Sequence, residues 1–331
     1  MRTLRPVSTI IIIVLTVSIL QVSGQVVHTP IFNGENAYDY LTGQCDFGPR
    51  PPGSDNLSLC RQYIIDTLKS FNWNVTLQNF TYMNTECYNI IATWNETTNS
   101  SIILGAHYDT RPEASADPDL LNRTKPILGA NDGASGTAVL MELARVLPIA
   151  NRSRVELVFF DAEDSGGIDN WNWIRGSVHY VSVLDTERIE SISAMILVDM
   201  IGDAALYLPK EGSSTPSLQN LIWSIAANLG YSTTFVDTPA TSIYDDHRPF
   251  LDAGIPAVDI IHVPFPSYWH TLADTPDKCS AESLEIVGRV LEVFVVDGEI
   301  PPPSDTPYVL YATLIIIPLI ILLVLYRRKK Q

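Results

Sequence analysis

Two adjacent carboxylates, Glu163 and Asp164, have the clearest capacity for chemistry in this sequence. They closely follow the apolar run 155–160, which is typical of a strand buried on both faces of an α/β sheet. Ligands of open α/β sheets bind at the carboxyl ends of the strands. Neighbouring carboxylates there repel each other and lose solvation. Such a pair is tolerated if a cation or a proton compensates its charge. We therefore expect one of the pair to hold a metal ion and the other to move a proton.

Four further acidic or imidazole residues fall at or near the ends of other predicted elements: His107, Asp132, Asp199 and His270. If the sheet is parallel in this region, these positions converge on one edge. Histidine and carboxylates around an open position are typical of catalytic zinc. Each residue also has a purely structural alternative. Asp132 could cap a helix, the two histidines could be buried and hydrogen-bonded, and Asp199 could simply end a strand. The prediction therefore depends on their joint placement.

The elements that must position these residues alternate between strands and helices. Strands are predicted at 73–80, 87–93, 101–106, 155–160, 194–199 and 257–261, and helices at 56–71, 134–147, 216–229 and 281–296. Loops are predicted at 43–54 and 110–127, where turn-forming and polar residues gather. This alternation indicates an α/β sandwich, with one catalytic domain over residues 25–298.

Several segments, taken in chain order, resemble the motifs of the zinc aminopeptidase and glutaminyl cyclase superfamily. They are 107–110 (HYDT), 129–136 (GANDGASG), 159–164 (FFDAED) and 197–202 (LVDMIG). Three later segments are similar to the glutaminyl cyclase branch, namely 245–251 (DDHRPFL), 254–258 (GIPAV) and 264–271 (PFPSYWHT). The resemblance covers nearly the whole predicted domain, from about residue 47 onward. It implies a three-layer sandwich in which helices flank a central, mixed and largely parallel sheet.

The resemblance also implies roles for the matching residues. The cyclases bind one zinc ion per chain, and the matching ligands here are Asp132, Asp164 and His270. The other matches are Glu163 as general acid and base, Asp199 and Asp245 as carboxylates that support proton transfer, and Trp269 and Tyr244 at the substrate pocket.

The aminopeptidases of the superfamily bind two zinc ions. Their second ion is held by the residues that match His107 and Asp199, with the match of Asp132 bridging, and this sequence has all three. Residue identity therefore leaves open whether one or two ions bind. Two positions depart from the pattern. Asp164 stands where animal cyclases and many aminopeptidases have glutamate, which shortens its reach, and Tyr244 replaces an amide side chain of the animal cyclases, which affects substrate positioning.

The activity implied by the resemblance is cyclisation of the N-terminal glutamine of peptides or proteins to pyroglutamate, with release of ammonia. Glu163 would take a proton from the α-amino group and give it to the leaving amine, while zinc would act as a Lewis acid. The alternative is a zinc aminopeptidase of the same fold, in which Glu163 activates an attacking water. A third class, a binding ectodomain without catalysis, agrees poorly with the intact set of predicted ligands.

Both ends of the chain carry apolar segments. Residues 1–24 have the pattern of a secretory signal peptide or an anchor, and residues 308–326 are uncharged and long enough to span a bilayer. The basic tail 327–331 follows directly, and such tails stay cytoplasmic. A proline-rich linker at 299–307 joins the second segment to the domain. We therefore expect a single-pass membrane protein with an extracellular or luminal catalytic domain.

The composition agrees with export and limits the partners. A net charge of −16 argues against nucleic acid, whose binding requires basic patches. The even number of cysteines predicts disulfides, with the pairing open among Cys45, Cys60, Cys87 and Cys279. Glycosylation sequons begin at Asn56, Asn74, Asn79, Asn95, Asn99, Asn122 and Asn151. The expected partners are the N-termini of peptides or proteins.

Overall fold

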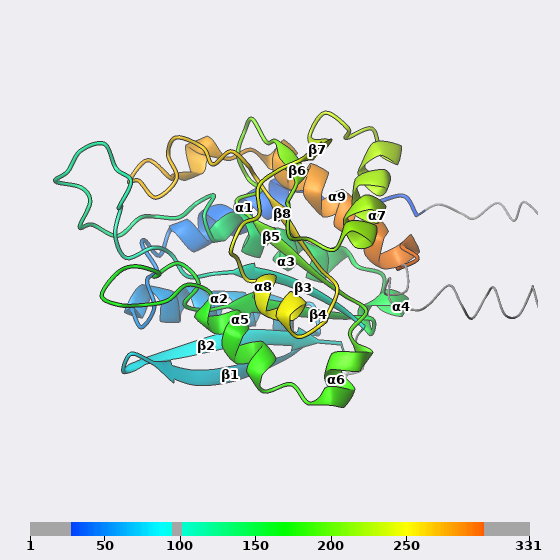
Figure 1. The fold of residues 1–331 in the computed structure, drawn as a ribbon, viewed down its shortest axis with the longest axis horizontal. Coiled ribbons are helices and arrows are strands. Elements are labelled where there is room, and N and C mark those ends of the chain that lie inside the picture. The colour runs from blue at the N-terminus through cyan, green and yellow to red at the C-terminus, as the bar shows by residue number, and fades with distance from the viewer. Residues whose placement is uncertain (1–27, 95–100, 301–331) are drawn as a thin grey trace, which may run out of the picture.

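A computed structural model of the chain describes residues 28–94 and 101–300, and its centre is a six-stranded sheet (Figure 1). In the order in which they lie side by side, the strands are β1 (Asn74–Tyr82), β2 (Thr85–Thr93), β4 (Val155–Phe160), β3 (Ile102–His107), β5 (Ala194–Asp199) and β8 (Ala257–Ile261). The last four run parallel to one another, whereas β2 is antiparallel to both β1 and β4. The predicted mixed, largely parallel sheet is confirmed.

Helices cover both faces of this sheet. One layer contains α1 (Gly34–Cys45), α2 (Asp55–Ser70), α3 (Ala134–Val146), α7 (Pro216–Asn228) and α9 (Ala281–Asp297), and the other contains α5 (Arg175–Ser182) and α8 (Arg248–Asp252). Successive side chains of a strand point to opposite faces, so Leu157 packs into one apolar cluster and Val158 into the other. The three-layer sandwich implied by the resemblance is therefore confirmed.

The elements missing from the sequence prediction are mostly short. Besides α1, α5 and α8, they are α4 (Ile149–Arg152), α6 (Thr186–Ser191), the 3₁₀ turn η1 (Pro276–Lys278), and a small sheet of β6 (Leu208–Lys210) and β7 (Phe235–Pro239). The helix α6 buries none of its residues, and β7 buries only its first. Without a buried face such segments have no apolar period, which is the signal on which a sequence prediction depends.

All four cysteines are buried free thiols, so the predicted disulfides are wrong for this structure. Cys45, Cys60 and Cys279 belong to the larger apolar cluster, where a thiol packs as a small apolar side chain. Burial raises the pKa of Cys45 and of Cys60 to about 11, so both remain protonated at neutral pH.

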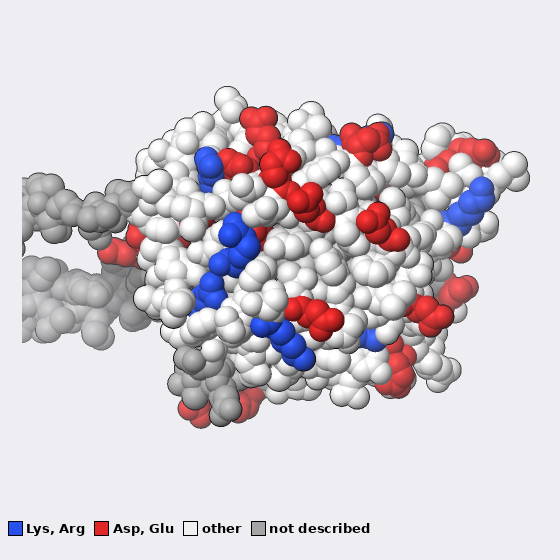
Figure 2. Space-filling view, turned by 180° about the vertical axis from the view of Figure 1, so that it is seen from behind, with Lys and Arg blue, Asp and Glu red and all other residues white. Residues whose placement is uncertain are grey.

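The two ends of the described chain lie side by side. The main-chain N–H of His28 donates to Asp297 at 2.7 Å, and these ends lie far from the loop 110–127 (Figure 1). Among residues 28–94 and 101–300, no helix is both long and apolar enough to cross a membrane. The predicted segments 1–24 and 308–326, the tail 327–331, most of the linker and the sequons at Asn95 and Asn99 lie outside the described residues. Acidic side chains are spread over the face shown in Figure 2, with basic side chains between them.

Candidate active site

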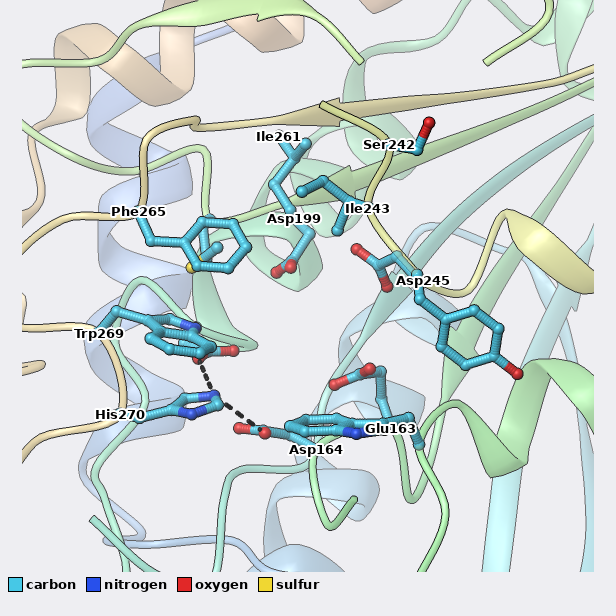
Figure 3. A pocket seen from close by; sticks show the side chains of 14 residues that line it. Glu163, Asp164, Asp199, Ser242, Ile243, Asp245, Ile261, Phe265, Trp269 and His270 are labelled. Carbon is cyan, nitrogen blue, oxygen red and sulfur yellow. Dashed lines mark ion pairs between the residues drawn. The ribbon is translucent and has the colours of Figure 1, made fainter. Parts of the chain in front are cut away.

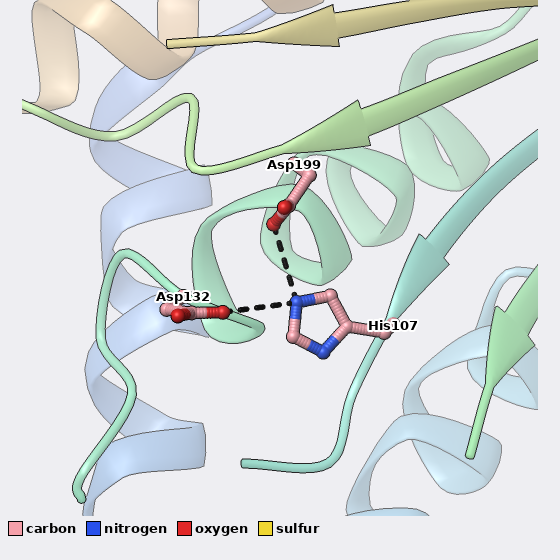
Figure 4. Close-up of side chains that lie close together, drawn as sticks. All are labelled: His107, Asp132 and Asp199. Carbon is pink, nitrogen blue, oxygen red and sulfur yellow. Dashed lines mark hydrogen bonds and ion pairs between the residues drawn. The ribbon is translucent and has the colours of Figure 1, made fainter. Parts of the chain in front are cut away.

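The parallel strands bring the predicted residues to one edge of the sheet. β3 ends at His107 and β5 ends at Asp199, while Glu163 and Asp164 follow the end of β4. The loop before α3 contributes Asp132. Figures 3 and 4 show these side chains pointing toward one another at the strand ends. The predicted convergence is therefore realised in the structure.

Asp132, Asp164 and His270 form a compact group that could hold a metal ion. Nε2 of His270 lies 3.2 Å from Oδ1 of Asp164 and 3.4 Å from Oδ2 of Asp132 (Figure 3). Donors bound at 2.0–2.1 Å to a tetrahedral zinc ion would lie about 3.3 Å apart. Oδ2 of Asp132 is buried and has no hydrogen-bond partner among the described residues. Both the spacing and the buried oxygen without a hydrogen-bond partner fit a cation.

A second group is formed by His107, Asp132 and Asp199. Nε2 of His107 lies 3.3 Å from Oδ1 of Asp132 and 3.2 Å from Oδ1 of Asp199 (Figure 4). Asp132 thus contributes one oxygen to each group. Burial, followed by the charge of Asp164, raises the pKa of Asp132 to about 6. Two neighbouring sets of ligands that share one carboxylate could hold either one ion or two.

Two buried carboxylates fix the main chain around these groups. Asp109 accepts the N–H groups of Glu163 and Asp164 at 3.1 and 3.2 Å, and Asp274 accepts the N–H of Asp132 at 3.1 Å. Asp109, within the segment 107–110, is therefore a supporting residue of the site. Asp274 was missed, although an acid four residues after His270 could have been noticed. Asp132 is not a helix cap, since α3 begins after Gly133.

The backbone is strained at three positions of the site. Ala162 precedes Glu163 with φ of +60°, Met200 follows Asp199 with φ of +48°, and His270 itself has φ of +54°. Residues other than glycine adopt this region at a cost, and such strain gathers at functional sites, where the surrounding structure holds it. The strain redirects the chain where each functional side chain must turn toward the same space.

A pocket of about 290 Å³ opens onto the first group. Its polar lining includes Glu163, Asp199 and Asp245, whose carboxylates face the same space in Figure 3. Its apolar walls are Trp173, Met200, Ile243, Ile261, Phe265 and Trp269. The ring of Trp269 stacks on His270 at 3.6 Å between centroids. Tyr244 also lines the pocket but is 63% exposed, so it forms part of the rim rather than the wall.

Two carboxyl groups of this pocket, those of Glu163 and Asp245, have raised pKa values. Burial, with a smaller contribution from Asp245, raises the pKa of Glu163 well above its usual range. Burial, followed by the charge of Asp199, does the same for Asp245. A carboxyl group whose pKa is raised in this way holds a proton more readily than an ordinary carboxyl group, so it can act as an acid as well as a base.

A further buried polar layer lies behind Asp245 and was not predicted as part of the site. Oδ1 of Asp246 accepts from the hydroxyl of Ser177, and Nε2 of His247 lies 2.9 Å from the hydroxyl of Ser213. Asp259, within β8, is fully buried. The acid pair 245–246 is a signal that could have pointed to Asp246, whereas a single aspartate inside an apolar strand, Asp259, gives no sign of its surroundings.

Comparison with known proteins assigns the chain to a family. The chain matches peptidase family M28 over residues 89–295. The glutaminyl-peptide cyclotransferase of Drosophila melanogaster is 27% identical over 285 residues, which cover 75% of this chain and 77% of the relative. The solved glutaminyl cyclase of Bacteroides thetaiotaomicron is 32% identical, with a TM-score of 0.74 over 82% of this chain and 100% of that chain.

A solved Zn-dependent exopeptidase of Parabacteroides distasonis is similar to the same extent. It is 30% identical, with a TM-score of 0.74 over 82% of this chain and 100% of that chain. The fold is thus shared by proteins named for cyclisation and for peptide hydrolysis. The chain belongs to peptidase family M28, and its resemblance to the glutaminyl cyclase branch is confirmed.

Proposed function

We propose that the protein is a zinc-dependent glutaminyl-peptide cyclotransferase, which converts the N-terminal glutamine of peptides or proteins to pyroglutamate and releases ammonia. The observation that carries the proposal is the pocket that joins the group of Asp132, Asp164 and His270 to the carboxyl groups of Glu163 and Asp245. The similar proteins that are named as glutaminyl cyclases support this activity.

In the proposed reaction the α-amino nitrogen attacks the γ-carbonyl carbon of the same residue, and the bond to the amide nitrogen breaks. A zinc ion held by Asp132, Asp164 and His270 would supply Lewis acidity at the γ-carbonyl. Glu163 accepts a proton from the α-amino nitrogen and donates it to the departing ammonia. Both reacting groups belong to one residue, so holding its conformation supplies much of the acceleration.

The walls of the pocket would hold that conformation. Trp173, Phe265 and Trp269 line the space in front of the carboxylates and would limit the access of water once a peptide is bound. Asp245 and Asp199 lie in the same pocket and would share charge with Glu163 during the transfer. An acidic floor also suits the positively charged amine of the incoming peptide before it loses its proton.

One observation favours a second candidate, a zinc aminopeptidase. The group of His107, Asp132 and Asp199 offers ligands for a second ion next to the first, as the resemblance implies for the peptidases. In that reaction Glu163 would take the proton of a water that attacks the first peptide bond. The similar exopeptidase supports this alternative.

A paired assay with bound zinc quantified distinguishes the two. Purified protein is incubated with glutaminyl peptides and with aminoacyl anilides, while ammonia, peptide mass and free amino acids are followed. Ammonia release from an otherwise intact peptide is the expected result. Free amino acids without ammonia would refute the cyclase and leave the peptidase, and the ratio of zinc to protein gives the number of ions.

The membrane topology predicted from residues 1–24 and 308–326 is part of the same proposal, with the catalytic domain outside the cytosol. Protease protection of intact vesicles that carry the full chain tests it. Digestion of the domain from the cytosolic side would contradict it.

A further inference from the structure

Arg111 is a buried cation beside the predicted ligands, with 6% of its surface exposed. Nη1 donates to Oδ1 of Asp164 at 3.1 Å and to the main-chain oxygen of the same residue at 3.4 Å. Nη2 donates to the oxygen of Gly166 at 3.3 Å, and Nε donates to the hydroxyl of Ser115 at 2.9 Å. The ring of Trp173 lies 4.8 Å from the guanidinium carbon. All three nitrogens have partners, so the orientation of the group is fixed.

The contact with Asp164 is notable because of that residue's length. An aspartate side chain is one methylene group shorter than a glutamate, so its main chain must lie closer to the metal group. The structure holds it there from two sides, since Asp109 accepts its N–H while Arg111 donates to its main-chain oxygen. The same guanidinium also bonds Oδ1, the oxygen that lies 3.2 Å from Nε2 of His270.

We infer that Arg111 is a positioning residue of the metal centre, which holds the short side chain of Asp164 in the place where it meets His270. This inference rests on the metal centre of the proposed function. Two effects of the guanidinium oppose each other. Its charge repels a cation, whereas a fixed partner behind a ligand strengthens binding by keeping that ligand oriented.

We expect orientation to dominate, because removal of the guanidinium would leave several buried acceptors without their donor. These acceptors are Oδ1 and the main-chain oxygen of Asp164 and the oxygen of Gly166. The segment that carries Asp164 would then relax away from His270. The three carboxylates of the two ligand groups also outnumber the single charge of Arg111, so the field at the centre stays attractive to a cation.

The test is the zinc affinity of the full chain, measured by competition with a chelator of known affinity. Arg111→Met should weaken zinc binding about 10- to 100-fold. Arg152→Met is a matched control, because Arg152 is also buried, donates to the oxygens of Leu147 and Phe71, and stacks on Trp94 at 4.5 Å. No described contact joins Arg152 to the metal group, so the zinc affinity of Arg152→Met should equal that of the wild type. Arg111→Lys keeps the positive charge but loses the planar guanidinium with its several N–H donors, so it should show most of the loss of zinc affinity.

A double-mutant cycle with Asp164→Glu tests the reason for the effect. With the longer side chain the carboxylate depends less on its support, so Arg111→Met should cost less affinity in this background. Equal costs in both backgrounds would overturn the inference. Unchanged zinc binding by Arg111→Met, tighter binding, or an equal loss in Arg152→Met would overturn it too. If the wild-type chain binds no zinc, both the metal centre of the proposed function and this inference fail. If the wild type binds zinc but the variants behave otherwise than expected, only this inference fails.

Discussion

Gly136 lies in the first turn of α3, where the helix passes close to the end of β5. A Cβ atom at this position would lie 2.2 Å from the main-chain oxygen of Val198 and 3.1 Å from Cβ of Ala106. Ordinary contacts of Cβ begin at 3.4 Å, so Gly136→Ala requires α3 and β5 to separate by about 1 Å, since a close-packed interior has no room to absorb the methyl group. Asp132 precedes α3 and Asp199 follows Val198, so the shift reaches both predicted ligands.

The expected cost in activity exceeds the cost in stability. Overpacking destabilises by about 1–3 kcal/mol, while alanine in place of glycine within a helix recovers about 1 kcal/mol. The net loss in the free energy of unfolding of Gly136→Ala is therefore about 0–2 kcal/mol. A displacement of about 1 Å at catalytic groups can lower the rate about 10²-fold. Most of the protein should then remain folded but turn over slowly.

Urea unfolding and kcat in the paired substrate assay measure the two effects separately. Gly288→Ala is a control, because its Cβ would lie 2.3 Å from the ring of Phe32, between α9 and the N-terminal segment. It should cost similar stability and leave the kcat of the folded protein unchanged. A wild-type kcat in Gly136→Ala would refute the reasoning, and so would an equal loss of kcat in Gly288→Ala.

Three further changes test other parts of the site. Glu163→Gln should lower kcat about 10²–10⁴-fold with zinc content unchanged, because Glu163 belongs to neither ligand group; a normal kcat contradicts its role. Asp132→Asn should abolish zinc binding, and with it the rise in melting temperature on zinc addition, because both groups share this residue; a retained rise contradicts the sharing. Burial lowers the pKa of His247 from 6.5 to about 4, so its contribution to stability is complete above pH 6.5 and is lost as the pH falls toward 4. Relative to His247→Gln, the wild type should lose about 1 kcal/mol of its free energy of unfolding between about pH 7 and about pH 5.5. Urea midpoints that change equally with pH in the two proteins would contradict this.

The sequence by itself determined the central strands and the chemistry at their ends. The run 155–160 is apolar except for Glu156 because both faces of β4 are covered, and consecutive residues of the sequence show this pattern directly. The acids and the histidine at or just after the ends of β4, β3 and β5 were therefore found from local patterns. Their convergence needed only one assumption about the sheet, that these strands run parallel.

The tertiary structure alone decided how these residues are shared and supported. Asp132 joins both ligand groups, Asp274 holds the main chain of Asp132 from 142 positions away, and Arg111 holds Asp164 from 53 positions away. The disulfides expected from four cysteines gave way to buried thiols. These contacts depend on the paths of loops, and loops have no periodic pattern that a sequence could display. The residue types therefore determined which chemistry is available, while the packing of distant segments determined which carboxylates can act as metal ligands and which support the main chain.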